Sequence, residues 1–294
     1  MATTELPAPP ALGPLYARAA LGAVRGGRAG HGGSTTLPDV ELVRRDVTVD
    51  PSHLADYARV CGFRVGDTLP LTYPHLLTFP LQVALMADRS FPLALPGMVH
   101  LTNRITAHRA IATAEALDVR VHAERFAAHP QGAQVDLVGT VSAGDETVWQ
   151  GRSTYLARGA RAPDGATAPA PAGIEAPTGS ASALWRVPAD AGRRYAAVSG
   201  DVNPIHLHPL AARAMGFPRA IAHGMWTAAR AVASLEGRLP DAVTYDVRFR
   251  KPVLLPARVE LVTAHDSGGD DGWRLAVRSA RTPDRLHLVG RVGT

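Results

Sequence analysis

The sequence predicts an α+β protein made of two related halves, each a central helix wrapped by a curved sheet of antiparallel strands. Three observations support this prediction. A segment rich in Ala and Pro divides the 294-residue chain, and similar stretches of sequence lie on either side of it. In both halves, a helical pattern is followed by several runs in which apolar and polar residues alternate. Such alternation is typical of strands that bury one face.

The dividing segment spans residues 161–182 and reads "RAPDGATAPAPAGIEAPTGSAS". It has no hydrophobic period, and small residues and proline dominate it, which is typical of a linker. The sequence therefore predicts a first repeat over residues 1–160 and a second repeat over residues 183–294.

The two repeats align along their length. "YARVCGF" from residue 57 matches "YAAVSGD" from residue 195, and the helical pattern "YPHLLTFPLQVALMA" from residue 73 matches "IAHGMWTAARAVASL" from residue 221, so that His75 aligns with His223. Strand-like runs follow each helix. They cover residues 98–111, 117–128, 133–144 and 146–158 in the first repeat, and residues 242–255, 257–267, 273–281 and 285–292 in the second.

The repeats differ where polar chemistry is concentrated. The distance between the aligned tyrosine and histidine is 18 residues in the first repeat and 28 in the second, and the extra residues fall on "DVNPIHLHP". The second repeat has Asp201 and Gly224 where the first has Phe63 and Leu76. Only the second repeat therefore carries a candidate acid/base site.

A carboxylate and an imidazole are a natural acid/base pair at neutral pH, because their ordinary pKa values lie near 4 and 6.5. Asp201 and His206 are five positions apart, and Pro204 between them fixes the backbone. We expect the bend to aim both side chains at one water molecule, with Asn203 either orienting the imidazole or capping the next turn. Gly224 starts the predicted helix and lets a ligand approach its backbone N–H closely.

"YAAVSGDVNPIH", followed by "PRAIAHGMWT", resembles the hydratase-2 motif of the MaoC-like enoyl-thioester hydratases and dehydratases. The whole chain resembles the double-hotdog members of that family, particularly the actinobacterial 3-hydroxyacyl-thioester dehydratases. This resemblance implies reversible syn addition of water to a trans-2-enoyl thioester, giving an (R)-3-hydroxyacyl thioester. It implies that Asp201 and His206 activate the water, that the Gly224 N–H binds the thioester oxygen, and that no metal or redox cofactor takes part.

Each candidate residue also has a structural alternative. Asp201 can be a turn residue with an Asx-type hydrogen bond, and His206 can be a buried imidazole with satisfied hydrogen bonds. The motif does not require His208, which we expect on the surface, and His223 is expected to help start the helix. A metal site made from these histidines and Asp201 is a competing hypothesis, which the interrupting prolines weigh against.

Two basic residues, Arg250 and Lys251, start the segment after the second helix and could contact the phosphates of coenzyme A or phosphopantetheine. An exposed basic sheet edge explains them equally well. The formal net charge is +5, but the basic residues are scattered, so we expect no nucleic-acid binding. The single Cys61, the absence of a signal-like start and the absence of a long apolar run predict a cytoplasmic protein without a membrane span.

Two other functions are compatible with the fold. A hotdog thioesterase would release a free thiol, and a non-catalytic subunit would bind an acyl thioester unchanged. The sequence does not determine acyl chain length, the choice between coenzyme A and acyl carrier protein, the physiological direction, or whether the chain forms a homodimer.

Overall fold

The computed structural model describes residues 1–26, 36–168, 173–266 and 272–294. The chain forms two compact units. The first unit comprises residues 1–48, 74–103 and 115–171, and the second comprises residues 49–73, 104–114 and 172–294. The second unit thus includes two segments that precede the predicted linker. Residues 169–172 of that linker, and Ser267 at the end of one predicted strand run, lie outside the described residues.

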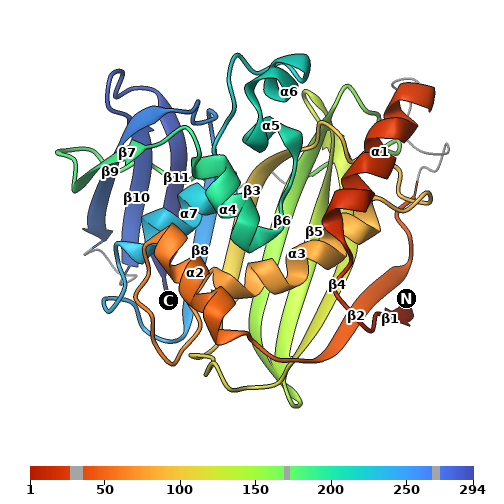
Figure 1. Cartoon of the computed structure of the whole chain (residues 1–294), viewed down its shortest axis with the longest axis horizontal. Helices are drawn as coiled ribbons and strands as arrows, with labels where there is room; N and C mark the ends of the chain where they lie inside the picture. Colours follow the sequence, from red (N-terminus) through yellow and green to blue (C-terminus); the bar gives the residue numbers. More distant parts are fainter. Residues whose placement is uncertain (27–35, 169–172, 267–271) are drawn as a thin grey trace. The chain divides into compact units, whose positions relative to one another are not determined.

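The first unit is a sheet with the central helix α3 across it and a further helix, α1 (Figure 1). Its strands lie in the order β1-β2-β4-β5-β6-β3, and all the pairings from β2 to β6 are antiparallel. Helix α3 packs on one face, where a Cβ on Gly139 of β5 would lie 2.7 Å from the Thr78 side chain. The elements that lie wholly or mostly in this unit are β1 (Ala2–Glu5), α1 (Leu12–Gly26), β2 (Val40–Val47), α3 (Tyr73–Met86), β3 (Val99–Ala107), β4 (Leu117–His129), β5 (Gly132–Ala143) and β6 (Glu146–Arg158).

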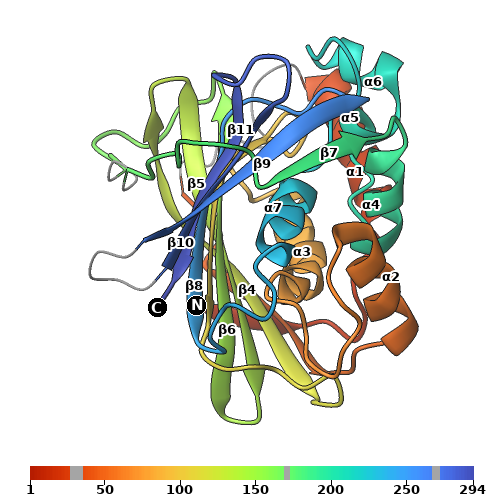
Figure 2. The same ribbon diagram turned by 90° about the vertical axis from the view of Figure 1, so that its left-hand side faces the viewer.

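The second unit repeats this plan with more helices. Its strands lie in the order β8-β11-β10-β9-β7, and every neighbouring pair is antiparallel. Helix α7 covers one face of the sheet (Figure 2), and the Tyr245 hydroxyl of β8 donates to the Ala228 carbonyl of α7 at 3.0 Å. The elements are α2 (Pro51–Cys61), β7 (Ala183–Val187), α4 (Ala191–Ser199), α5 (Pro204–Leu207), α6 (Pro209–Ala214), α7 (Gly224–Ala233), β8 (Val243–Phe249), β9 (Ala257–Asp266), β10 (Gly272–Ser279) and β11 (Leu286–Gly293).

The aligned motifs "YARVCGF" and "YAAVSGD" adopt the same local structure. Each ends a helix, α2 or α4, and the following glycine is left-handed, with φ of 84° at Gly62 and 70° at Gly200. Both glycine N–H groups donate to the carbonyl four residues back. Glycine adopts this conformation without the steric cost that a Cβ brings, which explains why both copies have it.

The predicted α+β architecture is confirmed, with a central helix and an antiparallel meander in each unit. The predicted strand runs correspond to β3, β4, β5, β6, β8, β9, β10 and β11. Three further strands, β1, β2 and β7, were not expected, nor were the helices α1, α2, α4, α5 and α6. None of the helices in the part of the chain that the structure describes has the length and apolar character that crossing a bilayer requires.

Candidate active site

The segment between α4 and α7 forms a compact polar corner in the second unit. Asn203 caps α5, with its side-chain oxygen accepting from the Ile205 N–H at 3.4 Å. The proline that follows occupies the first helical position, where its missing N–H is not needed. The same arrangement recurs one turn later, where the exposed His208 caps α6 and its Nδ1 accepts from the Leu210 N–H at 3.2 Å. These two caps turn the chain sharply and direct His206 inward.

His206 is buried and held by its backbone surroundings. Its Nδ1 lies 2.9 Å from the Ile221 carbonyl oxygen, which can only accept, so Nδ1 carries the proton and Nε2 keeps a lone pair. Burial lowers the pKa of His206 below its ordinary value, although the Asp201 carboxylate acts in the opposite direction. The imidazole is therefore neutral at pH 7 and has a basic nitrogen available.

Asp201 lies beside this imidazole and keeps part of its carboxylate accessible, with 19% of its side chain exposed. One oxygen, Oδ1, accepts from the Asn203 N–H at 3.2 Å, which is the Asx-type bond of the structural alternative. The other oxygen, Oδ2, is directed to the imidazole cluster and lies 3.7 Å from His223 Nε2. The turn bond and the site geometry therefore coexist, because one carboxylate has two oxygens to offer.

His223 also belongs to this site, although sequence reasoning assigned it first to helix initiation and otherwise only to the competing metal hypothesis. Its ring stacks on that of His206 with centroids 3.7 Å apart, and its Nε2 donates to the Asp201 backbone carbonyl at 3.0 Å. Burial and the neighbouring His206 lower the pKa of His223 to about 3, so it is neutral. Its Nδ1 is buried and finds no hydrogen-bond partner within the described ranges. His223 therefore fixes both members of the acid/base pair, and its alignment with the buried His75 gave no indication of this.

Together, Asp201, His206 and His223 form a tight cluster. One nitrogen or oxygen from each lies within 4.8 Å of the others. That spacing fits a carboxylate and an imidazole that share one water molecule. It also fits a bound metal ion, with Asp201 and the two imidazoles as ligands, whereas His208 points into its own helix cap.

Gly224 is the first residue of α7, and His223 before it is extended, with φ of −63° and ψ of 139°. The first N–H groups of a helix have no acceptor within the helix, and its dipole favours negative charge there. A Cβ at Gly224 would lie 3.0 Å from Cε1 of Phe249, so the ring leaves little space for a side chain at this position. Phe249 also lines a cavity of about 880 Å³ whose wall includes Arg250 and Lys251.

The structure thus gathers Asp201, His206 and Gly224 around one corner and adds His223. Asn203 serves as a helix cap, not as a contact to the imidazole. Arg250 and Lys251 line the neighbouring cavity and are exposed.

Known proteins resemble this chain over most of its length. A model of the MaoC like domain matches residues 175–281. The chain is 45% identical to 3-hydroxyacyl-thioester dehydratase X of Mycobacterium tuberculosis over 243 residues, which cover 83% of this chain and 85% of that protein. The crystal structure of that protein, HtdX, matches with a TM-score of 0.76 and 42% identity, covering 86% of this chain and 100% of the solved one.

More distant structures share the fold. A MaoC-like dehydratase from Phytophthora capsici matches with a TM-score of 0.73 at 18% identity, covering 88% of this chain and 96% of that chain. A hypothetical protein of M. tuberculosis, described as a double hotdog, matches with a TM-score of 0.50 at 20% identity, covering 84% of this chain and 92% of that chain. The predicted double-hotdog fold is confirmed, and the chain belongs to the family of MaoC-like dehydratases.

Proposed function

We propose that this chain catalyses the reversible hydration of trans-2-enoyl thioesters to (R)-3-hydroxyacyl thioesters. The observation that carries the proposal is the cluster in which the Asp201 carboxylate and the neutral His206 imidazole approach within 4.8 Å. Family membership and the name of HtdX, a 3-hydroxyacyl-thioester dehydratase, support the reaction type. The (R) configuration follows from the family resemblance and is part of the proposal.

In the hydration direction, one water molecule lies between the Asp201 carboxylate and Nε2 of His206. Its oxygen bonds to C3 of the enoyl group while the pair accepts one of its protons. The electrons of the double bond move onto the thioester oxygen, where the Gly224 N–H and the dipole of α7 stabilise the enolate. A proton then passes from the pair to C2, so the pair is restored. Because both steps use one face of the substrate, the addition is syn, and dehydration is the reverse.

The ring orientation of His206 is essential to this proposal. Its Nδ1–H is held by the Ile221 carbonyl, so Nε2 is the only nitrogen that can accept a proton. Its depressed pKa keeps this nitrogen unprotonated at neutral pH, and the carboxylate stabilises the imidazolium that forms transiently.

The decisive experiment compares His206→Ala and Asp201→Asn with His208→Ala in hydration of crotonyl-CoA. The first two variants should lose about 10²–10⁴-fold in kcat, which is the range for removal of a general acid or base. His208→Ala removes an imidazole two positions away that only caps α6, so it should retain activity. Undiminished turnover by either pair variant, with its circular dichroism unchanged, would refute the assignment. Chiral analysis of the product tests the configuration.

Two other functions are distinguished by direct assays. A thioesterase would release free thiol from the same substrate, and a non-catalytic binding subunit would leave both thioester and double bond intact. The metal hypothesis uses the same three side chains as water activation by the pair alone. Metal analysis of the purified protein, together with activity measured before and after adding a chelator, distinguishes the two.

The proposed substrate is an acyl thioester of coenzyme A or acyl carrier protein, and the proposed compartment is the cytoplasm. The compartment is supported by the single cysteine of the sequence, Cys61, which is buried and has no second cysteine for an intrachain disulfide.

A further inference from the structure

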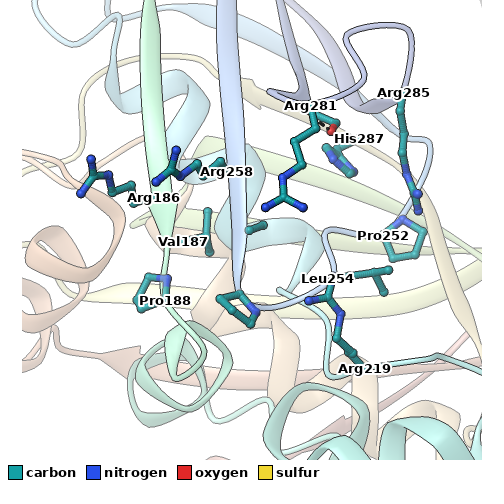
Figure 3. Close-up of a pocket in the computed structure, with 13 residues that line it drawn as sticks. Arg186, Val187, Pro188, Arg219, Pro252, Leu254, Arg258, Arg281, Arg285 and His287 are labelled. Atoms are coloured by element: carbon teal, nitrogen blue, oxygen red, sulfur yellow. Dashed lines mark hydrogen bonds between the residues drawn. The ribbon is translucent and has the colours of Figure 1, made fainter.

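A second cavity of the second unit is lined by arginine. It has a volume of about 580 Å³, within the usual range of small-ligand pockets. Five arginines contribute to its wall, and we call it the arginine pocket (Figure 3). They are Arg186, Arg219, Arg258, Arg281 and Arg285. No carboxylate from the described residues lines it, so the site carries a strong excess of positive charge.

These arginines come from four separate parts of the chain. Arg186 lies on β7, Arg258 on β9, Arg219 in the loop before α7, and Arg281 and Arg285 in the β10–β11 turn. In Figure 3, Arg186 and Arg258 lie at one end of the pocket and Arg285 at the other, with Arg281 extending between them. All five are exposed, so a dissolved ligand can reach them.

The charge of the pocket is not compensated in the way it is elsewhere in this unit. On the neighbouring strands Arg274 pairs with Asp266 at 2.7 Å, and Arg278 pairs with Glu260 at 2.8 Å. No ion pair joins the five pocket arginines to any carboxylate in the ranges that the structure describes. Arg186 and Arg258 are direct register partners on β7 and β9, and like charges at such positions destabilise a sheet. An anionic ligand would remove this repulsion.

The pocket is also connected to the acid/base site through the backbone. Leu254, in its wall, forms a β-bridge with Ile221, the residue whose carbonyl holds His206 Nδ1. Arg219 lies two residues before Ile221 in sequence. The pocket therefore shares part of its backbone framework with the catalytic imidazole.

We infer that the arginine pocket binds the phosphate groups of coenzyme A, namely its pyrophosphate and 3′-phosphate, and so selects coenzyme A thioesters. The inference rests on the proposed function, because it assigns the carrier of the same substrate. Arginine suits this role because its planar guanidinium donates two parallel hydrogen bonds to a phosphate. The several phosphates of coenzyme A match a pocket with several arginines. This differs from the sequence-based assignment of phosphate contacts to Arg250 and Lys251, which line the adjacent cavity.

Calorimetry with adenosine 3′,5′-bisphosphate tests the pocket without any chemistry. The double variant Arg186→Gln/Arg258→Gln removes two pocket charges and also their mutual repulsion, so the sheet should remain folded. Each lost charge-assisted hydrogen bond weakens binding by roughly tenfold or more, so the double variant should bind at least about a hundredfold more weakly. Arg250→Gln/Lys251→Gln is the matched control, with the same loss of charge in the other cavity, and should bind normally.

Kinetics then connect the pocket to turnover. The Arg186→Gln/Arg258→Gln variant should raise KM for crotonyl-CoA strongly while leaving kcat/KM unchanged for crotonyl-pantetheine, which lacks these phosphates. Normal bisphosphate binding by this variant would overturn the inference. Weakened binding by the control variant alone would also overturn it, and so would a native protein that is active only with an acyl carrier protein thioester. Bisphosphate binding by a native protein that hydrates neither substrate would instead reject the proposed function and retain the anion site.

Discussion

The role of the Gly224 N–H can be tested by replacing the glycine with proline. Gly224→Pro removes this single donor, while the first position of a helix is where proline is best tolerated. His223 is already in the extended conformation that a following proline requires, with φ of −63° and ψ of 139°. The backbone should therefore accept the ring without unfolding α7.

Gly224→Ala is the matched control because it keeps the N–H. Both variants place a Cβ about 3.0 Å from Cε1 of Phe249, so both require a similar small shift of that ring. The ratio of their kcat values then isolates the hydrogen bond. Loss of one donor to a developing oxyanion costs about 10²–10³-fold in kcat, or roughly 2.7–4 kcal/mol.

The assay is the loss of enoyl-thioester absorbance during hydration of crotonyl-CoA, measured at saturation for both variants. Gly224→Pro should be at least a hundredfold slower than Gly224→Ala. Equal kcat values for the two folded variants would show that the thioester oxygen is bound elsewhere.

Three further predictions concern stability, each measured by urea unfolding. The pKa of His223 is about 3 in the folded chain and near 6.5 in the unfolded chain, so only the unfolded chain binds a proton there as the pH falls from 6.5 to 5. The free energy of unfolding should therefore decrease by about 2 kcal/mol over this range. His223→Phe should reduce this pH dependence. Gly62→Ala should lower the free energy of unfolding by about 1–2 kcal/mol, because φ there is 84° and the added Cβ must also displace the Arg230 guanidinium; Gly66→Ala, in open space, should leave it unchanged. Tyr245→Phe should lower the free energy of unfolding by about 1 kcal/mol, because it removes the buried hydrogen bond to the Ala228 carbonyl. An unchanged urea midpoint would contradict this prediction.

Local pattern was sufficient to predict most of the fold. The strand-like runs predicted β4, β5 and β6 closely; burial alternates along the first part of β4, whereas β5 and β6 also contain consecutive buried residues. The repeat aligned Gly62 with Gly200, and both adopt the left-handed conformation that ends a helix, although no helix was predicted from the sequence at either place. The short helices α5 and α6 were not predicted, although both begin at a Pro that follows a capping residue. Four to six residues are too few to show a helical period.

From the residues alone, the candidate site was predictable only where its members are close in sequence, whereas Gly224 became a candidate through the family motif. Asp201 and His206 lie five positions apart, so one turn brings them together. His223 is 22 positions from Asp201, and its alignment with His75 indicated a structural role. The arginine pocket was missed for the same reason, since residues such as Arg186 and Arg281 meet only after β7, β9 and the β10–β11 turn are assembled.

The composition of the second unit has a consequence for any attempt to divide the chain. Residues 49–73 precede the linker, yet they belong to the unit that holds the catalytic pair. Within it, the Trp226 indole donates to the Val60 carbonyl at 3.1 Å, and His53 bonds the Val198 carbonyl at 2.7 Å. A fragment beginning at residue 183 would lack both partners and leave apolar surface of α4 and α7 uncovered. A cut at the linker therefore does not separate the two units, because the catalytic unit depends on residues from both sides of it.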